Sequence, residues 1–396
     1  MYLKNWVMRL NYRTIGEYIK QVNIKNHGGQ VDLLLGVNLD KKFMPSVANI
    51  VGTDLTKYKI IKKGQFGCKL MSVGRDKKLP ISLLTEHDEA IISTAYFVFE
   101  IIDETELLPD YLMMWFRRSE SDRYLWFQSG GDIRGRITWD DLCSLPIKVP
   151  STEKQRAIVK EYNTVVNRIK LRETLNQKLE ETAQALYNHW FVNFEFPNES
   201  GQPYKSSGGK MIYNEELDKE VPIGWSEILL PDLIEVKYGK DYKHLTEGSI
   251  PLYGSGGVMK YVNDFLYDKP SILIPRKGTL SNIMYVDEPF WSVDTMFYSK
   301  LKNENFAFYT FYYLKQLDFM SLNVGSAVPS MTTKMLNSFK LAQPHSDILD
   351  KFNSKLQVLN NHSTNLKIQN KNLGKLASTL LSKMSKIDSL QTEQAI

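Results

Sequence analysis

The sequence predicts an α/β (α+β) protein with two globular domains, separated by two long helices that pack as an antiparallel coiled coil. Three observations predict this fold. The chain has 396 residues, more than one ordinary hydrophobic core organises. Its second half repeats the pattern of its first half. Each half also ends in a long stretch with the three-four spacing of a packed helix. The repeat predicts a pseudo-twofold relation between the halves.

The repeat is clearest in "NQKLEETAQALYNHWF", which starts at Asn176, and "NKNLGKLASTLLSKMS", which starts at Asn370. One shift of 194 residues relates the matching positions. The matched pairs include Leu179 and Leu373, Ala183 and Ala377, Leu186 and Leu380, Pro150 and Pro344, and Thr138 and Thr332. Upstream, "STAYFVFE" and "VDTMFYSK" correspond only after small changes of length. The two front parts have therefore diverged while keeping a common plan.

The front part of each half reads as mixed strand and helix. In the first half, "AIISTAYFVFEII" predicts a strand and "PDYLMMWFRRSESDRYLWF" predicts a helix with an aromatic face. In the second half, "SILIP" and "NIMYV" predict strands around the basic turn "RKGTLS", and "FAFYTFYYLKQ" predicts the matching helix. The aromatic residues of both helices have helical spacing, which favours core packing over base stacking.

The two long helices carry a narrow apolar seam. We expect the first to begin at "PSTEKQ", with Thr152 as the N-cap and Gln155 completing a capping box, and the second to begin at Ser346. About forty residues at roughly 1.5 Å each give a rod on the order of 60 Å long. The seam positions expected to pack are Ile158, Tyr162, Val165, Ile169, Asn176, Leu179 and Leu186 in the first helix, and Phe352, Leu356, Leu359, Leu366, Asn370, Leu373 and Leu380 in the second.

Such a seam is narrower than a broad core face, so the two helices are expected to pack on one another. Packing of each helix on its own domain is the alternative. Asn176 and Asn370 occupy matching seam positions, where a buried amide can fix the register at some cost in stability. We expect both amides near the middle of the helix pair, close to the pseudo-twofold axis.

Charge and cysteine content set broad limits on function. The net charge of +5 comes from 50 basic and 45 acidic residues, and this balance favours a nucleic-acid partner only weakly. Cys68 and Cys143 lack metal-ligand spacing, and the start "MYLKNWVMRL" has no signal-peptide core. No apolar run is long enough to cross a membrane. We therefore expect a protein of the reducing cytoplasm with no membrane contact.

Two segments carry a resemblance to a known family. One is "ALYNHWFVNFEFPNESGQPYKSSGGKM" after the first long helix, and the other is "IPLYGSGGVMKYVNDFLYDKPSILIPRKGTLSNIMYVDEPFWSVDTMFY" in the second half. With the loop and proline-initiated helix pattern found in both halves, the likeness covers nearly the whole chain. The chain resembles the specificity subunits of type I restriction-modification systems of bacteria and archaea.

The resemblance implies a function and a set of partners. In that family, two target-recognition domains alternate with two helical spacers, and each domain reads one part of a split sequence in double-stranded DNA. The spacers dock methyltransferase subunits, of which we expect two, and motor-nuclease subunits join to cut unmethylated DNA. The chain would then be non-catalytic, without metal or cofactor of its own. S-adenosylmethionine, ATP and Mg would be held by the partner subunits.

The same resemblance gives the expected domain boundaries. Residues 1–150 form target-recognition domain 1, followed by the central helical spacer at residues 151–196. Residues 197–344 form target-recognition domain 2, which starts with an exposed linker at residues 197–212 that is rich in Pro, Gly and Ser. Residues 345–396 form the C-terminal helical spacer.

The candidate DNA contacts of the first domain are mostly basic. Eight basic residues between Lys57 and Lys78 face one acid, Asp76, which suits the neutralisation of phosphates. A solvated surface is the alternative. The loop "SGGDIRGRIT" adds glycines that allow close approach to a duplex and arginines that can grip guanine or phosphate. The expected contacts are Lys57, Lys59, Lys62, Lys63, Lys69, Arg75, Lys77, Lys78, Arg134, Arg136 and Thr138.

The candidate contacts of the second domain are mostly neutral. Its counterpart loop, "VGSAVPSMTT", has no arginine, as expected if the two domains read different sequences. The basic turn "RKGTLSN" and the loop "LYGSGGV" complete the candidate surface, although Lys and Gly in a tight hairpin also serve solubility. The expected contacts are Tyr253, Ser255, Arg276, Lys277, Ser281, Asn282, Ser330 and Thr332.

Three other classes of function are alternatives to this one. An adenine methyltransferase needs an Asp/Asn-Pro-Pro-aromatic loop, but the chain has no Pro-Pro, and "GSGGVM" lacks the third glycine of a dinucleotide loop. A metal-dependent nuclease using Asp232, Glu235 and Lys237 is disfavoured because acids three residues apart on a strand face opposite ways. A helical scaffold without DNA readout is the remaining alternative, and it would leave the repeated α/β domains without a role.

Overall fold

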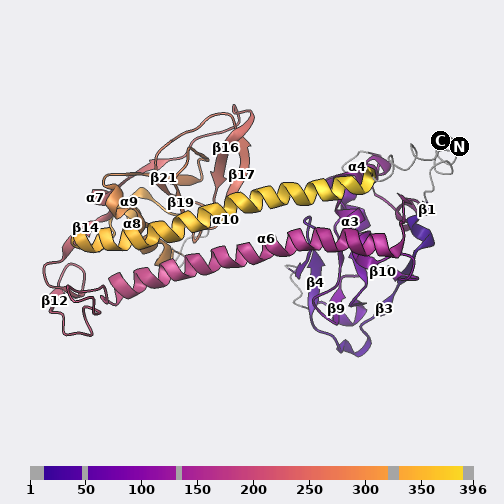
Figure 1. Cartoon of the computed structure of the whole chain (residues 1–396), viewed down its shortest axis with the longest axis horizontal. Coiled ribbons are helices and arrows are strands. Elements are labelled where there is room, and N and C mark those ends of the chain that lie inside the picture. The colour runs from indigo at the N-terminus through magenta and orange to yellow at the C-terminus, as the bar shows by residue number, and fades with distance from the viewer. Residues whose placement is uncertain (1–12, 47–51, 131–135, 320–329, 387–396) are drawn as a thin grey trace. The chain divides into compact units, whose positions relative to one another are not determined.

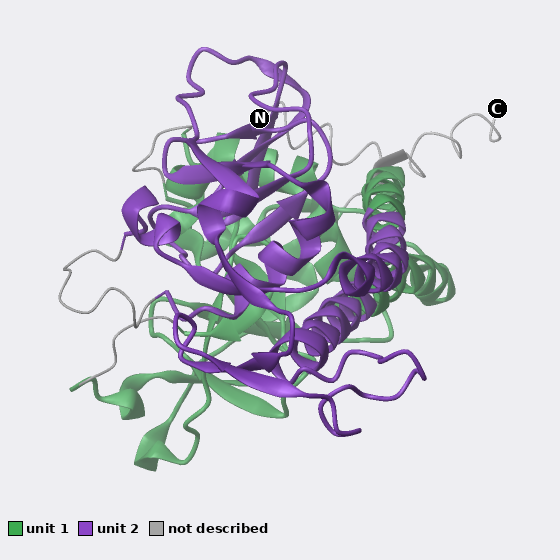
Figure 2. Cartoon of the chain, turned by 90° about the vertical axis from the view of Figure 1, so that its left-hand side faces the viewer, with its two compact units in different colours: residues 1–172, 368–396 green, residues 173–367 purple. Residues whose placement is uncertain are grey.

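The computed structural model describes residues 13–46, 52–130, 136–319 and 330–386. The chain forms two compact units, shown in different colours in Figure 2. Unit 1 comprises residues 1–172 and 368–396, and unit 2 comprises residues 173–367. The first and the last described residues, 13 and 386, therefore belong to the same unit, because a long helix leads from each unit into the other.

Unit 1 is built mainly from short strands with helices on one side (Figure 1). Its strands are β1 (Arg13–Thr14), β2 (Ile19–Val22), β3 (Ile24–Lys25), β4 (Leu34–Val37), β5 (Phe43–Pro45), β6 (Lys59–Lys62), β7 (Phe66–Cys68), β8 (Ile81–Leu83), β9 (Glu89–Ile92), β10 (Phe97–Ile101) and β11 (Pro146–Ile147). Its helices are α2 (Val73–Asp76), α3 (Pro109–Arg117), α4 (Ser119–Gln128), α5 (Trp139–Cys143) and the start of α6 (Thr152–Tyr187).

Two sheets of unit 1 pack face to face. An antiparallel sheet has the order β2-β10-β7-β8, and a five-stranded sheet has the order β3-β6-β9-β4-β5. Gly67 lies where they meet, because a Cβ there would come within 3.2–3.3 Å of Phe43, Ile61 and Ile92. The other face of the four-stranded sheet is covered by α3, α4 and α5, whose buried side chains share one core with the sheet. The loops at the strand ends thus rest on a two-sided core.

Unit 2 follows the same plan. Its strands are β12 (Met211–Asn214), β13 (Lys219–Pro222), β14 (Ser226–Leu229), β15 (Ile234–Tyr238), β16 (Glu247–Gly254), β17 (Gly257–Val262), β18 (Ser271–Pro275), β19 (Met284–Val286), β20 (Trp291–Ser292), β21 (Met296–Leu301) and β22 (Lys340–Gln343). Its helices are the end of α6, α7 (Leu230–Leu233), α8 (Ala307–Gln316), α9 (Thr333–Asn337) and the start of α10 (Ser346–Lys386).

The strand order of unit 2 matches the repeat seen in the sequence. Its antiparallel sheet has the order β15-β21-β18-β19, the same path through the chain as β2-β10-β7-β8 in unit 1. A second sheet, β17-β16-β20, packs on one face, and α8 and α9 cover the other. The two units therefore share one architecture, and β18 corresponds to β7.

The helices α6 and α10 pack together within each unit. In unit 1, Tyr162 and Val165 near the start of α6 share a core with Leu380 near the end of α10. In unit 2, Tyr187 at the end of α6 lies 6.4 Å, ring to ring, from Phe352 near the start of α10. The start of each helix thus meets the end of the other, so the predicted antiparallel pairing is confirmed (Figure 1).

The other seam positions are divided between the same two cores. Ile158, Ile169 and Leu373 are half-buried against the core of unit 1, and Leu186, Leu356 and Leu359 lie in or against that of unit 2. Leu366 is buried, and Leu179 is half-buried. Together these positions make up the seam that the sequence predicted, as far as α10 is described.

Asn176 and Asn370 both lie away from bulk solvent. Each side chain is half-buried, and each Oδ1 is buried without a hydrogen bond to any described residue. The Nδ2 of Asn370 donates to the carbonyl oxygen of Ile169 at 3.4 Å, which ties α10 to α6 within unit 1. Their position relative to a symmetry axis, and their role in fixing the register, stay predictions.

The start of α6 differs from the predicted capping box. Thr152 is the first helical residue, and its hydroxyl donates to the carbonyl oxygen of Thr105 at 2.8 Å. The fully buried Gln155 bonds instead to the loop before α3, donating to Glu106 and accepting from the N–H of Leu108 at 2.9 Å. That loop supplies partners that the local sequence cannot reveal.

Three further segments are broken where the sequence pattern is continuous. "AIISTAYFVFEII" forms β9 and β10, which belong to different sheets and are joined by a turn from Ser93 to Tyr96. The aromatic helix is divided into α3 and α4 at Arg118, whose backbone is extended. "PDLIEVK" is the end of α7 followed by β15, so Asp232 lies on a helical turn and not on a strand.

The segment predicted as a linker is largely exposed, but it is anchored at its start. The ring of Phe196 stacks on Tyr204 at 4.7 Å and on Trp225 at 5.3 Å. Met211 then begins β12, which pairs with β13 as a separate hairpin. The domain boundaries as a whole stay predictions.

Candidate nucleic-acid interface

Three loops that are distant in sequence meet at one end of the sheet in unit 2. They are the turn between β16 and β17, the loop between β18 and β19, and the segment that leads into α9. The Nδ2 of Asn282 donates to the carbonyl oxygen of Ser255 at 2.8 Å, and the N–H of Met331 donates to that of Arg276 at 2.9 Å. The structure therefore brings Ser255, Arg276 and Asn282 close together. Met331, which lies between the predicted contacts Ser330 and Thr332, belongs to the same group.

Close packing holds two of these loops together. Gly278 has φ +85°, and a Cβ there would lie 2.5 Å from the Oγ of Ser255, so this position requires glycine. Lys277 and Ser281 on the same loop are exposed. The loop therefore exposes the side chains of Lys277 and Ser281, on a backbone that is held in place by its packing against Ser255.

Several predicted contacts have structural roles of their own. The hydroxyl of Thr332 accepts from the N–H of Met335 at 3.1 Å and so caps α9. Thr138, its partner in the repeat, forms a capping box with Asp141 at the start of α5. Tyr253 is half-buried, and burial raises the pKa of its hydroxyl. A DNA contact by these residues would have to use their remaining exposed atoms.

The basic stretch of unit 1 is divided between two places. Lys57, Lys59, Lys62 and Lys63 lie on or beside β6 of the five-stranded sheet. Lys69, Arg75, Lys77 and Lys78 lie in the connection between β7 and β8 of the other sheet. One run in the sequence therefore becomes two groups in space.

Some members of the β6 group are engaged internally. The Nζ of Lys59 donates to the carbonyl oxygen of Tyr96 at 2.6 Å and lies 5.5 Å from the ring centroid of Phe97, and burial lowers its pKa. Lys57 lies 3.5 Å from Asp54, and Lys63 lies 3.8 Å from Asp88. Lys62 is exposed on the strand.

In the connection between β7 and β8, two of the four cations contact aromatic rings. Lys77 has φ +54°, and its Nζ lies 5.0 Å from the ring centroid of Trp126. Lys69 lies 5.9 Å from the ring centroid of Tyr96. Arg75 forms two hydrogen bonds with Asp76, which lower the pKa of that carboxyl.

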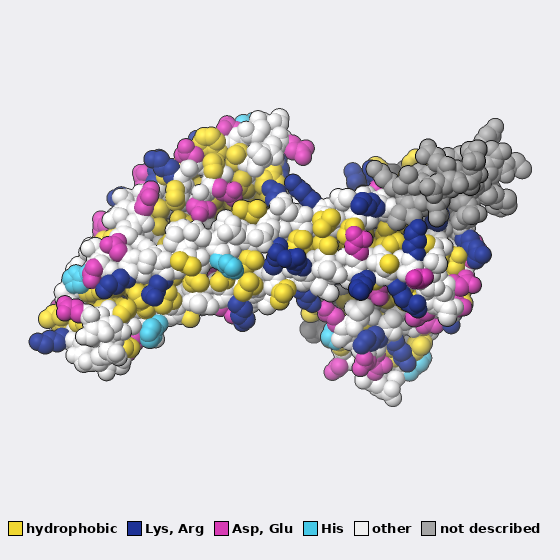
Figure 3. Space-filling view, in the orientation of Figure 1, with side chains coloured by type: hydrophobic (Ala, Val, Ile, Leu, Met, Phe, Trp, Pro, Cys, Tyr) yellow, Lys and Arg dark blue, Asp and Glu magenta, His cyan; other side chains and the backbone are white. Residues whose placement is uncertain are grey.

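The remaining residues of this predicted surface are less completely described. Lys78 and Arg136 are exposed, and Arg134 lies outside the described residues. On the face drawn in Figure 3, the basic side chains of unit 1 are interspersed with acidic ones. The candidate contacts are therefore distinguished by where each side chain lies, more than by an excess of positive charge.

Sequence reasoning missed two exposed aromatic side chains near these loops. Tyr238 at the end of β15 is 53% exposed and lies beneath the guanidinium of Arg276. Phe127 at the end of α4 is 80% exposed, in the segment just before "SGGDIRG". Both residues fit the periodic pattern of their own strand or helix, so the sequence does not mark them as exposed. Only the strand pairing and burial in the structure show that they are.

The residues of the nuclease alternative do not converge on one site. The carboxylate of Asp232 accepts from the N–H of Leu229 at 3.2 Å, which caps α7. Glu235 forms an ion pair with Lys237 at 2.6 Å along β15, which lowers the pKa of the Glu235 carboxyl. Among the residues that the structure describes, no three His, Cys, Asp or Glu side chains are grouped to hold a metal ion.

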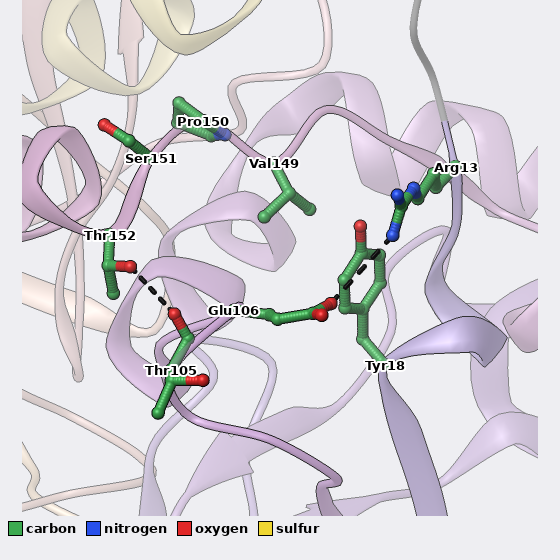
Figure 4. A pocket seen from close by; sticks show the side chains of 8 residues that line it. All are labelled: Arg13, Tyr18, Thr105, Glu106, Val149, Pro150, Ser151 and Thr152. Atoms are coloured by element: carbon green, nitrogen blue, oxygen red, sulfur yellow. Dashed lines mark hydrogen bonds and ion pairs between the residues drawn. The ribbon is translucent and has the colours of Figure 1, made fainter.

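A pocket of about 350 Å³ lies at the start of α6 in unit 1 (Figure 4). Arg13 lies beside Tyr18 and 3.9 Å from Glu106, and Thr152 bonds to Thr105 across the opening. These contacts fasten the helix to the loop before α3. We therefore interpret the pocket as part of the packing between α6 and that loop, and not as a ligand site.

No helix within the described ranges is long and apolar enough to span a membrane. The fold and its loops define the class of protein. Two α/β units share one plan and are connected by a pair of long antiparallel helices. Each unit carries basic side chains on loops at one end of a sheet. Comparison with known proteins then shows which proteins the chain is similar to.

Residues 222–373 match the family model described as type I restriction modification DNA specificity domain. The chain is 25% identical over 311 residues to the type I restriction enzyme MjaIX specificity subunit of Methanocaldococcus jannaschii, covering 72% of this chain and 70% of that protein. It is 28% identical over 160 residues to the HindI specificity subunit of Haemophilus influenzae, covering 40% of this chain and 34% of that one.

The fold is also similar to that of a solved structure. The crystal structure of the type I S subunit from M. genitalium matches with a TM-score of 0.52 and 18% identity, over 95% of this chain and 96% of that one. Residues 222–373 thus match the DNA specificity domain of type I restriction-modification systems, and most of the chain is similar to a specificity subunit of such a system, as the resemblance implied. The chain is therefore similar to the DNA-specificity component of such a system.

Proposed function

We propose that the chain reads a DNA target in two parts separated by a fixed unread gap, one part with each unit. It would recruit two methyltransferase subunits, which hold S-adenosylmethionine, and motor-nuclease subunits, which use ATP and Mg. The observation that carries the proposal is the shared strand order of the two units combined with different residues on their loops. One architecture used twice with different loops suits the reading of two different sequences.

The residues of the candidate interface support a division of labour. Unit 1 offers mainly lysines, which suit phosphates, whereas unit 2 offers one arginine and one lysine among hydroxyl and amide groups. Exposed Lys62, Lys77 and Lys78 are assigned to phosphate contact, and Lys59 is assigned to the fold because its Nζ is bonded internally. Arg134, which lies outside the described residues, is assigned to DNA contact from the sequence alone.

The paired helices are proposed to set the gap. Both α6 and α10 run unbroken through residues of the two units, with 36 and 41 residues. A helix rises about 1.5 Å per residue, so α6 is about 54 Å long. In dimeric repressors the spacing of half-sites mirrors protein geometry, and here one chain would take the part of the dimer.

The outer faces of the helices support docking of partner subunits. Leu171 on α6 is 70% exposed, and Val358 and Ile368 on α10 are 67% and 55% exposed. Figure 3 shows hydrophobic side chains at the surface along the helices. Exposed apolar side chains on otherwise soluble helices suit a protein partner, and we assign them to the methyltransferase subunits.

Duplex DNA binding at two salt concentrations tests the proposal. The chain, coexpressed with its cognate methyltransferase subunits, is expected to lose DNA affinity steeply between 50 and 200 mM salt, by about 10³-fold if six phosphates are neutralised. Fluorescence anisotropy of a labelled duplex measures the affinity. A complex without salt-dependent DNA binding would favour the helical scaffold, and metal-dependent cutting by the isolated chain would favour the nuclease.

A further inference from the structure

We propose that Arg276 is the side chain with which unit 2 reads a guanine base. The proposal rests on the DNA-reading function and adds the residue and the base. Arg276 directly follows β18, on the loop that Asn282 ties to the β16–β17 turn. Its side chain is half-buried, whereas that of its neighbour Lys277 is exposed.

The guanidinium rests on a rigid aromatic platform. Its Cζ lies 5.5 Å from the ring centroid of Tyr238, within the range of a cation–π contact. The Tyr238 ring in turn lies edge-on to Phe297 at 4.9 Å, and Phe297 is fully buried. Arginine stacks on aromatic faces through its planar group, so the platform orients the guanidinium.

The backbone and one terminal nitrogen of Arg276 are fixed as well. Its N–H donates to the carbonyl oxygen of Thr295 at 2.9 Å, and its carbonyl oxygen accepts from Met331 at 2.9 Å. Nη1 donates to the carbonyl oxygen of Asp294 at 3.1 Å. Both ends of the side chain are therefore held before any ligand binds.

One edge of the guanidinium is left for a ligand. Within the described residues, the Nε and Nη2 groups of Arg276 make no hydrogen bond. Two parallel N–H donors match the O6 and N7 acceptors that guanine presents in the major groove. A pre-oriented side chain also loses less freedom on binding. The two donors would also fit a phosphate. The fixed direction of the side chain favours a base edge, whereas the exposed charge of Lys277 is sufficient for a phosphate.

Unit 1 differs at the corresponding place. There the residue directly after β7, the strand equivalent to β18, is Lys69, whose Nζ lies 5.9 Å from the Tyr96 ring centroid. A lysine has no planar pair of donors. The two units would therefore recognise different bases from the same end of the same sheet.

Mapping of methylated adenines in cells that carry the complete methyltransferase complex tests the proposal. With Arg276→Lys, the preference for guanine at one position of one half-site is expected to fall about 10- to 100-fold. With Arg276→Gln, the preference at that position is expected to move toward adenine, whose N6 and N7 suit an amide. The other half-site stays unchanged in both variants.

Lys277→Ala is the matched control on the same loop. It is expected to keep both half-sites and to lower the salt slope of DNA binding by about 1. If both Arg276 variants kept the wild-type sequence and only weakened methylation at every site, Arg276 would be a phosphate contact and the proposal would fail. If the wild-type chain directed no sequence-specific methylation, the proposed function itself would fail. Hydrogen exchange of residues 271–286 verifies that each variant keeps the loop folded.

Discussion

Phe352→Ala is expected to lower the free energy of unfolding of unit 2 by about 3–5 kcal/mol. Phe352 is fully buried where α10 meets the end of α6. Its ring lies 4.8 Å from that of Phe191 and 5.7 Å from that of Trp190. Alanine would leave a cavity among aromatic rings that cannot all move inward, and α10 would lose its ring contacts with Tyr187, Trp190 and Phe191.

Urea unfolding measures this effect. It is monitored by hydrogen exchange with mass spectrometry, which separates the signals of the two units. Val358→Ala is the control, because Val358 lies on the same helix and is 67% exposed. Its expected effect is within about 0.5 kcal/mol. Equal effects of the two substitutions would mean that Phe352 is not part of a helix-to-helix core.

Asp122→Ala is expected to destabilise unit 1 by about 3–5 kcal/mol, because it leaves a buried ammonium without its counter-ion. The Nζ of Lys41 lies 2.8 and 2.9 Å from the carboxylate oxygens of Asp122 and also donates to the carbonyl oxygen of Phe116. Asp122 accepts from the N–H of Leu79 as well, at 3.0 Å. Burial lowers the pKa of Lys41 despite this partner.

The pair fastens the β4–β5 turn to the start of α4. The double variant Lys41→Met with Asp122→Leu is expected to be less destabilised than Asp122→Ala, because it removes both charges. Asp88→Ala is the surface control, since Asp88 is exposed and lies 3.8 Å from Lys63, and its expected effect is about 0–1 kcal/mol. A double variant as unstable as Asp122→Ala would show that packing, and not the unpaired charge, determines the loss.

The long helices could be predicted from the sequence because their signal is local and repeated. The three-four spacing runs through dozens of residues, and the shift that relates Asn176 to Asn370 excludes coincidence. The pairing of the two helices followed from the narrow seam, and its antiparallel direction followed from the family resemblance. The start of α6 was predicted less well, because Gln155 finds its partners on a loop that is distant in sequence.

The candidate interface could be predicted only in part. Residue type alone pointed to Arg276 and the lysines. The platform under Arg276 depends on the pairing of β15 with β21, which places Tyr238 opposite Phe297. The basic stretch of unit 1 was read as one strip, but short strands assign Lys59 and Lys69 to different sheets. Pairing between distant strands leaves little trace in one sequence.

The most direct test of two separate readers on one chain is an exchange of residues 1–150 for the matching segment of a related specificity subunit. Methylated adenines would then be mapped across the genome, with the methyltransferase partners present. We expect one half-site to change, while the other half-site and the length of the gap stay as they were. A change in both half-sites, or a variable gap, would contradict the proposal of two separate readers on one chain.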